Sequence, residues 1–320
     1  MSGIRLGNIE SRHLVTGVIR SGTTFVGKVL SLPWSVDYIH EPFAGGYSLP
    51  DRRLFSPDYV RIGNGERSER HRAHVAHLFR YDFGLSTMRD HRDFRHMKIV
   101  KHIVGSRGPV YLQLAKLNPI HRAVVIKDPL AKLQAEYLYR EFGVRPVIVV
   151  RHPVSLAASL QRVGWYPEVK DFASQPELVE DYFSGDATFL QRAWSSRLLE
   201  AMGHWRATYK VLLAQAERYS DWQVVTHEAL SADPLAEFER LYNTLQLPWS
   251  PRIARKVQRM TGGRNSAEAT GGQAMDLKRD SARIFEMRRD AIPEETRQAI
   301  FEIVSDVALR LYPRESFAID

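Results

Sequence analysis

The sequence predicts an α/β protein, a single domain with a central, mostly parallel sheet flanked by helices. Short apolar runs alternate with longer helical patterns, which is the order that gives parallel sheets with helices on both faces. The first four runs are almost continuously apolar, as strands buried on both faces are. A chain of 320 residues can form one large domain, so residues 1–320 are expected to form one.

Five apolar runs are expected to be the strands of this sheet. A long helical pattern extends from about residue 187 to 219, before the fifth run. A last helix is expected over residues 293–311, with Pro293 near its first turn. The expected strands are residues 14–19, 36–39, 123–126, 147–150 and 223–226.

Two segments depart from this alternation. Residues 44–95 lack the alternation and contain glycine-rich turns and a basic stretch, and we expect an acceptor-binding insertion there. Within it, ERSERHRAHVAHLFR (residues 66–80) predicts one exposed helix, either a solvated surface helix or part of a flap over the site. Residues 261–273 contain GGRNSAEATGG, which is typical of a mobile loop. The histidines of the exposed helix are expected on one basic surface: His71, His74 and His77.

The composition indicates an ordered globular protein, with 44% hydrophobic and 26% charged residues. The absence of cysteine excludes disulfides, thiolate nucleophiles and cysteine-bound zinc, and it fits a reducing compartment. The first ten residues lack the apolar core of a signal peptide, and no run approaches 18 apolar residues. We therefore expect a cytoplasmic protein without a transmembrane helix; its oligomeric state stays open.

The positive charge suggests an anionic ligand. A net charge of +8 and a pI near 9.6 suit nucleic acid, an anionic membrane surface or a small anion. The sequence contains neither a recognisable nucleic-acid-binding module nor a repeat of fixed period. A phosphorylated small molecule is therefore expected rather than nucleic acid.

The stretch HLVTGVIRSGTTF, residues 13–25, ends a strand in a basic, hydroxyl-bearing turn at residues 20–24, here called the first turn. Ligands of open α/β sheets bind at the carboxyl ends of strands. A helix is expected to open over residues 25–31 with Thr23 or Thr24 as its N-cap, and the N–H groups at a helix start attract anions. The first turn is therefore expected to bind phosphate.

Arg20 is the charged residue of the first turn. Its guanidinium is a rigid fork of donors that can bind two phosphate oxygens at once. The alternative is a structural role in which Arg20 pairs with Glu41 or Asp128. The turn is not a nucleoside-triphosphate P-loop, because GxxxxGK[ST] requires lysine where Thr23 stands. Magnesium-dependent ATP chemistry is thereby disfavoured.

The stretch VIVVRHPVSLAASL, residues 147–160, repeats this pattern. An apolar strand ends at Arg151, and Pro153 suits the first turn of a helix that carries Ser155 and Ser159. The arginine and a serine of this helix can share one anion; the alternative is a buried pair between Arg151 and a carboxylate. Residues 151–153 are here called the second turn. Two turns suited to anions in one sheet favour the functional interpretation.

Together the two turns resemble the sulfotransferases that use 3'-phosphoadenosine 5'-phosphosulfate (PAPS), nearest to carbohydrate-type and bacterial members. The resemblance covers residues 13–31 and 122–165 and implies a P-loop-like sulfotransferase fold. It implies that Arg151 and Ser159 bind the 3'-phosphate. A looser match near the C-terminus adds Lys278 and Arg279 to the cofactor-binding residues. The residues implied for the 5'-phosphosulfate are Arg20, Ser21, Gly22, Thr23 and Thr24.

The resemblance also implies catalytic residues. Lys127 ends the strand 123–126 and would act with Arg20 on the leaving phosphate. The cytosolic small-molecule branch has its histidine base where this chain has Pro129, so the base is expected in the stretch IHEPF after the second strand. Glu41 is the first candidate and His40 the second. In the alternative, Glu41 only pairs with Arg20 or caps the turn.

The implied reaction transfers a sulfuryl group from PAPS to a hydroxyl or amine of a carbohydrate, lipid or other small-molecule acceptor, without a metal. Aromatic residues near the expected crevice would either bind that acceptor or serve as ordinary core and rim residues. Two alternatives are kept: a P-loop-like kinase or other nucleotide-binding enzyme, and a non-enzymatic nucleic-acid binder. The aromatic residues are Trp34, Tyr38, Phe43, Tyr47, Trp165 and Tyr166.

Overall fold

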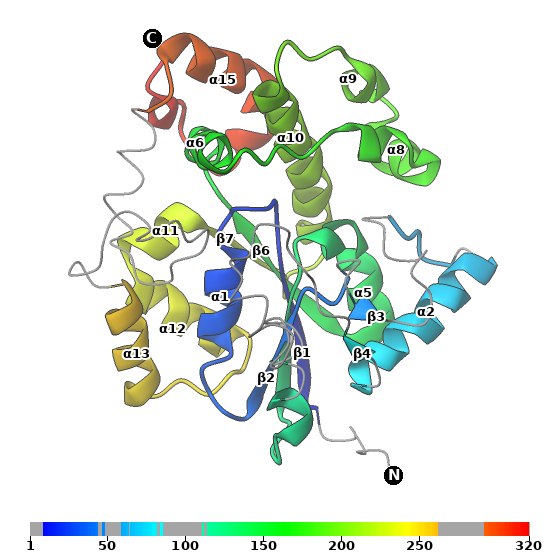
Figure 1. Cartoon of the computed structure of the whole chain (residues 1–320), viewed down its shortest axis with the longest axis vertical. Coiled ribbons are helices and arrows are strands. Elements are labelled where there is room, and N and C mark those ends of the chain that lie inside the picture. Colours follow the sequence, from blue (N-terminus) through cyan, green and yellow to red (C-terminus); the bar gives the residue numbers. More distant parts are fainter. Residues whose placement is uncertain are drawn as a thin grey trace, which may run out of the picture. The chain divides into compact units, whose positions relative to one another are not determined.

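The computed structural model describes residues 9–43, 47–48, 59–63, 65–81, 84–85, 111, 114–261 and 291–319 (Figure 1). Its residues group into two compact units. The first unit comprises the chain up to residue 16 and residues 30–146, and the second comprises residues 17–29 and 147–320.

The first unit contains three parallel strands in the order β2-β5-β1. Parallel strands of near-continuous apolar sequence are expected to be buried, and every residue of β5 is. In the register, both Val15 and His40 pair with Lys127, so the carboxyl ends of the three strands lie level. The strands are β1 (Ser11–Thr16), β2 (Val36–His40) and β5 (Ala123–Lys127).

Helices and one two-residue antiparallel strand pair complete the described part of the first unit. Helix α2 was expected to be exposed, but it buries one face because Val75 and Leu78 are apolar and point into the core. His71 is also buried, with its Nε2 3.1 Å from Gln134 Oε1, so its predicted place on a basic surface is wrong. The elements are α2 (Gly65–Phe79), η2 (Leu130–Gln134), α5 (Ala135–Phe142) and the antiparallel pair β3 (Tyr47–Ser48) and β4 (Gly84–Leu85).

The second unit contains strand β7 (Gln223–Thr226) and β6 (Val144–Val150) from Val147 onward, which pair in parallel in a register that places Val150 opposite Thr226. Helices α6, α10 and α15 pack against one another, and α11, α12 and α13 follow in succession (Figure 1). The helices are α1 (Thr23–Leu30), α6 (Pro153–Val163), α7 (Lys170–Ala173), α8 (Pro176–Phe183), α9 (Ala187–Gln191), α10 (Arg197–Ala216), α11 (His227–Ala232), α12 (Pro234–Thr244), α13 (Pro251–Thr261), α15 (Glu294–Ala308) and η4 (Arg314–Phe317).

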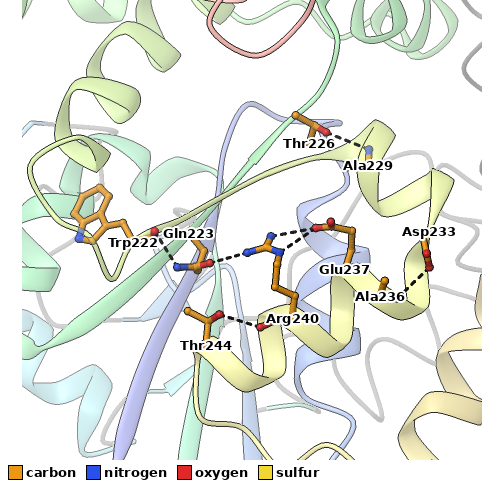
Figure 2. Close-up of polar contacts among 9 residues, drawn as sticks. All are labelled: Trp222, Gln223, Thr226, Ala229, Asp233, Ala236, Glu237, Arg240 and Thr244. Atoms are coloured by element: carbon orange, nitrogen blue, oxygen red, sulfur yellow. Dashed lines mark hydrogen bonds and ion pairs between the residues drawn. The ribbon is translucent and has the colours of Figure 1, made fainter.

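The connection from β7 to α12 is fixed by two N-caps (Figure 2). Thr226 Oγ1 accepts the N–H of Ala229 at 3.1 Å and so starts α11 directly after the strand. Asp233 caps α12 in the same way, through the N–H of Ala236 at 3.0 Å. Figure 2 also shows Arg240 between Gln223 and Glu237, bonded to each at 3.0 Å. Thr226 thus fixes the start of α11, and Asp233 fixes the start of α12.

The fold class is confirmed as α/β with a parallel central sheet, and three element boundaries differ from expectation. Strand β1 ends at Thr16 because Gly17 has φ +147°, and a Cβ there would lie 2.3 Å from Val149 O. Helix α1 begins at Thr23, so neither threonine is its N-cap. The pattern over residues 187–219 forms two helices, since Ser196 caps a new one through Leu199 N–H at 3.2 Å.

The predicted C-terminal helix is present as α15, which Pro293 immediately precedes. Across the described ranges, no helix combines the length and the apolar character that crossing a bilayer requires. The single-domain assignment and the acceptor-binding role of residues 44–95 stay predictions. Most of residues 44–95, and residues 262–273 of the predicted loop, lie outside the described residues.

Candidate active site

The first turn has an unusual backbone conformation, with positive φ at Arg20 and Gly22. Arg20 has φ +69°, a left-handed conformation that is uncommon for a side chain with a Cβ and that concentrates at functional sites. Gly22 has φ +96°, and a Cβ there would lie 2.9 Å from the His227 ring. Its carbonyl accepts the N–H groups of Phe25 and Val26 at 3.0 and 3.1 Å. Of the first four N–H groups of α1, these two are therefore already bonded, which leaves those of Thr23 and Thr24 to bind an anion.

Ser21 faces the interior of the second unit. The Tyr209 hydroxyl donates its one hydrogen to Val149 O at 2.7 Å, so Ser21 Oγ donates to Tyr209 over 3.1 Å. The N–H of Ser21 donates to Val18 O at 3.2 Å. Both donors of Ser21 are therefore used within the protein, and its direct contact with a cofactor stays a prediction.

Arg151 of the second turn is a buried cation, only 4% exposed. Its Nη1 donates to Arg20 O at 3.0 Å, and its own carbonyl accepts Trp205 Nε1–H at 3.0 Å. Among the described residues no carboxylate forms an ion pair with Arg151, and its Nε is buried without a hydrogen-bond partner. A buried charge without a counter-ion is costly, so this arrangement indicates a place for an anion.

Two buried serines lie on the same face of α6. Ser155 and Ser159 are four residues apart, and each is 1% exposed. Neither Oγ has a hydrogen-bond partner within the described residues. Buried hydroxyl groups are normally satisfied, so unpartnered hydroxyls on the helix that follows Arg151 fit an oxyanion such as a phosphate ester.

Glu228 holds the second turn from the start of α11. Its Oε1 accepts the His152 N–H at 3.2 Å, and its Oε2 accepts the Tyr312 hydroxyl at 2.9 Å. The His152 ring contacts Tyr312 and Phe317, with centroids 4.8 and 4.4 Å apart. The only sequence signal for this support is weak, a carboxylate two residues after the fifth expected strand, and there is none for Tyr312.

The burial of Glu228 predicts a pH dependence of stability. Burial raises the pKa of Glu228 to about 7, well above its ordinary value of 4.5. The folded protein therefore holds a proton that the unfolded chain releases between these values, so this contribution to stability is complete below about pH 4.5 and lost as the pH rises through about 7. Glu228→Gln should flatten the decline in unfolding free energy between pH 5 and 8.

Urea unfolding of both proteins at several pH values measures this difference. Across this range, the decline in unfolding free energy should shrink by about 3 kcal/mol, since one pKa unit corresponds to about 1.4 kcal/mol. Part of the slope should survive in the variant, because burial also raises the pKa of Asp128 to about 7. Parallel curves for the two proteins would show that Glu228 does not titrate in this window.

In the first unit, the structure brings the predicted catalytic residues Lys127, Glu41 and His40 together. Lys127 is buried, and its Nζ forms an ion pair with Glu41 Oε1. Glu41 has φ +49°, and its N–H donates to Lys127 O at 2.7 Å. His40 Nε2 lies 3.9 Å from Glu41 Oε1, and its Nδ1 lies 3.0 Å from the Tyr38 hydroxyl. The sequence did not anticipate the pairing of Glu41 with Lys127.

Asp128 fixes the segment that carries Glu41. The side chain is completely buried, and its Oδ2 accepts the Phe43 N–H at 2.7 Å while Oδ1 accepts the Leu130 N–H at 2.8 Å. It therefore ties the segment after β2 to the end of β5. Sequence analysis considered Asp128 only as a possible partner of Arg20. Its position directly after Lys127 was nevertheless a signal for a structural role at the end of β5.

The remaining predicted residues are less informative. Lys278, Arg279 and the side chain of Tyr47 lie outside the described residues. Tyr38 and Phe43 are buried, whereas Trp34 and Trp165 are exposed and Tyr166 is half-buried, so the described aromatic residues divide between core and surface. Within the described ranges, no three His, Asp or Glu side chains form a group that could hold a metal ion. Metal-free chemistry stays a prediction.

Solved structures with low sequence identity resemble this chain in part. The sulfotransferase domain from the curacin biosynthetic pathway is 15% identical, with 94% of this chain and 98% of that chain covered and a TM-score of 0.47. Retinol dehydratase in complex with retinol and PAP is 15% identical, with 95% and 84% covered and a TM-score of 0.47. Sulfotransferase STF9 from Mycobacterium avium is 13% identical, with 89% and 77% covered and a TM-score of 0.43.

No curated protein matches the chain significantly. The family model described as the sulfotransferase family matches residues 14–251. That match includes the first turn, the Glu41 and Lys127 positions, the second turn and the start of α11. It spans well over half of the 320 residues, and the chain therefore belongs to the sulfotransferase family.

Proposed function

We propose that this protein transfers a sulfuryl group from PAPS to a hydroxyl or amine of a carbohydrate, lipid or other small-molecule acceptor in the cytoplasm. Family membership supports the reaction class. The observation that carries the use of PAPS is the buried Arg151 guanidinium, which has no described carboxylate partner and accompanies two unpartnered serine hydroxyls. This donor set fits a phosphate monoester.

The two turns divide the recognition of the nucleotide. Arg151 and Ser159 would bind the 3'-phosphate, and Arg20 with the N–H groups at the start of α1 would bind the 5' side. A nucleotide without a 3'-phosphate leaves the buried hydrogen-bond donors of Arg151 and Ser159 without an acceptor from the ligand. Such unpaired groups are costly, which gives the site its selectivity.

When bound, PAPS supplies the sulfuryl group, whose bond to the phosphate oxygen breaks as a bond to the acceptor oxygen or nitrogen forms. Arg20 and Lys127 would stabilise the negative charge that develops on the leaving phosphate. Glu41 would accept the proton of the acceptor, with His40 as the second candidate. Lys127 now neutralises Glu41, so a lysine drawn to an anion would leave Glu41 able to act as the base.

The kinase alternative is not favoured, because Thr23 stands where a P-loop requires lysine. The nucleic-acid alternative is not favoured either, since Arg151, Ser155 and Ser159 are buried and do not belong to an exposed basic surface. Steep salt dependence of binding without any effect of small nucleotides would revive it.

Thermal unfolding with nucleotides tests the use of PAPS before the acceptor is known. Adenosine 3',5'-bisphosphate should raise the melting temperature, because a ligand of the folded state at about 100 times its Kd adds about 2.7 kcal/mol. Adenosine 5'-phosphate, ADP and magnesium-ATP at the same concentration should raise it much less. They provide no 3'-phosphate for Arg151 and Ser159.

Arg151→Ala is the matched variant for this experiment. It should remove most of the difference between the ligands and change the ligand-free protein little, because no described carboxylate loses a partner and the bond lost is the one to the Arg20 carbonyl. A strongly destabilised variant that keeps the wild-type ligand ranking would make Arg151 structural. Equal stabilisation of the wild type by all four nucleotides would contradict the proposed function itself.

A further inference from the structure

Helix α10 reaches both anion-binding turns from one side of the second unit. Trp205 and Tyr209 lie one helical turn apart on α10, with ring centroids 4.8 Å apart, and both are completely buried. Each ring carries one polar group, and buried polar groups of aromatic residues normally have a specific partner. In this protein, the partners lie at the ends of the two strand-to-helix connections.

Tyr209 holds the first turn. Its hydroxyl donates to Val149 O at 2.7 Å and accepts both the Val18 N–H and the Ser21 hydroxyl at 3.1 Å. All the hydrogen-bonding capacity of this hydroxyl is thus used on backbone and side-chain groups next to Arg20 and Arg151. Gly17 allows the close approach, because a Cβ there would lie 3.1 Å from the Tyr209 hydroxyl oxygen.

Trp205 holds the second turn. Its Nε1–H donates to the carbonyl of Arg151 at 3.0 Å, and the Arg151 guanidinium in turn donates to the carbonyl of Arg20 at 3.0 Å. The two turns are therefore bonded to each other and to one helix. None of these bonds uses Arg151 Nε, so the donors inferred to bind the 3'-phosphate stay available.

The helix that carries this pair is itself anchored. Arg206 on α10 binds Asp306 of α15 with two donors, at 2.6 to 3.0 Å, and Asp186 at 2.7 Å. Gly203 packs so closely on Trp194 that a Cβ would lie 2.3 Å from the indole ring. A rigid element is the kind of support that holds binding groups at a fixed separation.

We propose that Trp205 and Tyr209 are positioning residues that fix the separation of the two anion subsites, and thereby the preference for a nucleotide with phosphates at both the 3' and the 5' position. This inference rests on the proposed function. A ligand with two anions gains over one with a single anion only when both subsites are held at the matching distance. A loosened turn should therefore reduce the advantage of the bisphosphate more than the affinity for either monophosphate.

Calorimetric titration of three nucleotides tests the proposal. The ligands are adenosine 3',5'-bisphosphate, adenosine 5'-phosphate and adenosine 3'-phosphate, and the readout is the affinity of the bisphosphate relative to the better monophosphate. Tyr209→Phe keeps the ring and removes the three hydrogen bonds. The relative affinity should fall by about tenfold, the effect of losing about one well-placed hydrogen bond, with each monophosphate weakened by much less.

Two further variants separate positioning from stability. Trp205→Phe removes the bond to Arg151 at the other end of the pair, and it should lower the same ratio. It keeps the test possible if Tyr209→Phe fails to fold. Tyr242→Phe is the control, because Tyr242 is equally buried and its hydroxyl donates to Val29 O at 2.5 Å, outside both turns. It should lower the melting temperature and keep the wild-type ratio.

Wild-type ratios in both Tyr209→Phe and Trp205→Phe would overturn the positioning role while leaving the proposed function intact. A ratio that falls equally in Tyr242→Phe would also overturn it, because general destabilisation would then account for the effect. A wild-type protein that shows no advantage for the bisphosphate would overturn the proposed function and this inference with it.

Discussion

Arg20→Ala should lower turnover on the order of 10²-fold or more, as the loss of a transition-state donor does in other enzymes, and leave the fold nearly intact. Arg20 lies in the first turn, directly before a helix start, and its guanidinium is the rigid fork of that turn. The contact that ties its backbone to the second turn uses the Arg20 carbonyl, which alanine keeps. Steady-state turnover with PAPS, together with the melting temperature, measures the two effects separately.

Three comparisons separate the charge of Arg20 from its backbone conformation. Arg20→Gly should fold at least as stably as Arg20→Ala, since glycine adopts φ +69° without strain, and it should be equally inactive. Arg20→Lys keeps a charge and loses the fork, so its turnover should lie between the wild type and alanine. Arg240→Ala, which removes a guanidinium bonded only to Gln223 and Glu237 in Figure 2, should keep wild-type turnover. Activity within a few-fold of wild type in Arg20→Ala would refute the catalytic role.

The ends of these strands could be predicted approximately, because basic residues interrupt runs of apolar residues there. Apolar runs stop at Arg20, Lys127 and Arg151, and these runs are close to the observed β1, β5 and β6. The exact end of β1 was not predictable, because it depends on the close approach of Gly17 to Val149 O, a contact far from local in sequence.

The supports of the turns were not predictable from pattern alone. Trp205 and Tyr209 have the spacing of ordinary core residues on a helix, and nothing in their sequence shows that their polar atoms bond to turns 54 to 191 residues away. Glu228 and Tyr312 are likewise joined only in the folded chain. The sequence thus identified the residues expected to meet the ligand, and the structure adds the residues that hold them.

The pairing of Glu41 with Lys127 follows from strand register. Strands β2 and β5 are adjacent, and their register places His40 opposite Lys127, so the next residue after β2 reaches the lysine. Sequence analysis had both strands but not their order in the sheet. Sequence analysis therefore assigned Glu41 and Lys127 separate roles. Because the two side chains form an ion pair, a substitution of Glu41 also tests its contact with Lys127.

Glu41→Gln should lower turnover by about 10² to 10⁴-fold, the usual contribution of a general base, while binding of adenosine 3',5'-bisphosphate persists. Glutamine keeps the shape and can still accept from Lys127, but it cannot take the acceptor proton. Glu141→Gln is the matched control, because Glu141 pairs with Arg72 elsewhere in the same unit and should keep wild-type turnover. If His40→Ala alone reduces turnover, the base is His40, which lies 3.9 Å from Glu41. If neither variant does, the base lies outside this pair, and the ion pair between Glu41 and Lys127 serves only to fix the end of β5.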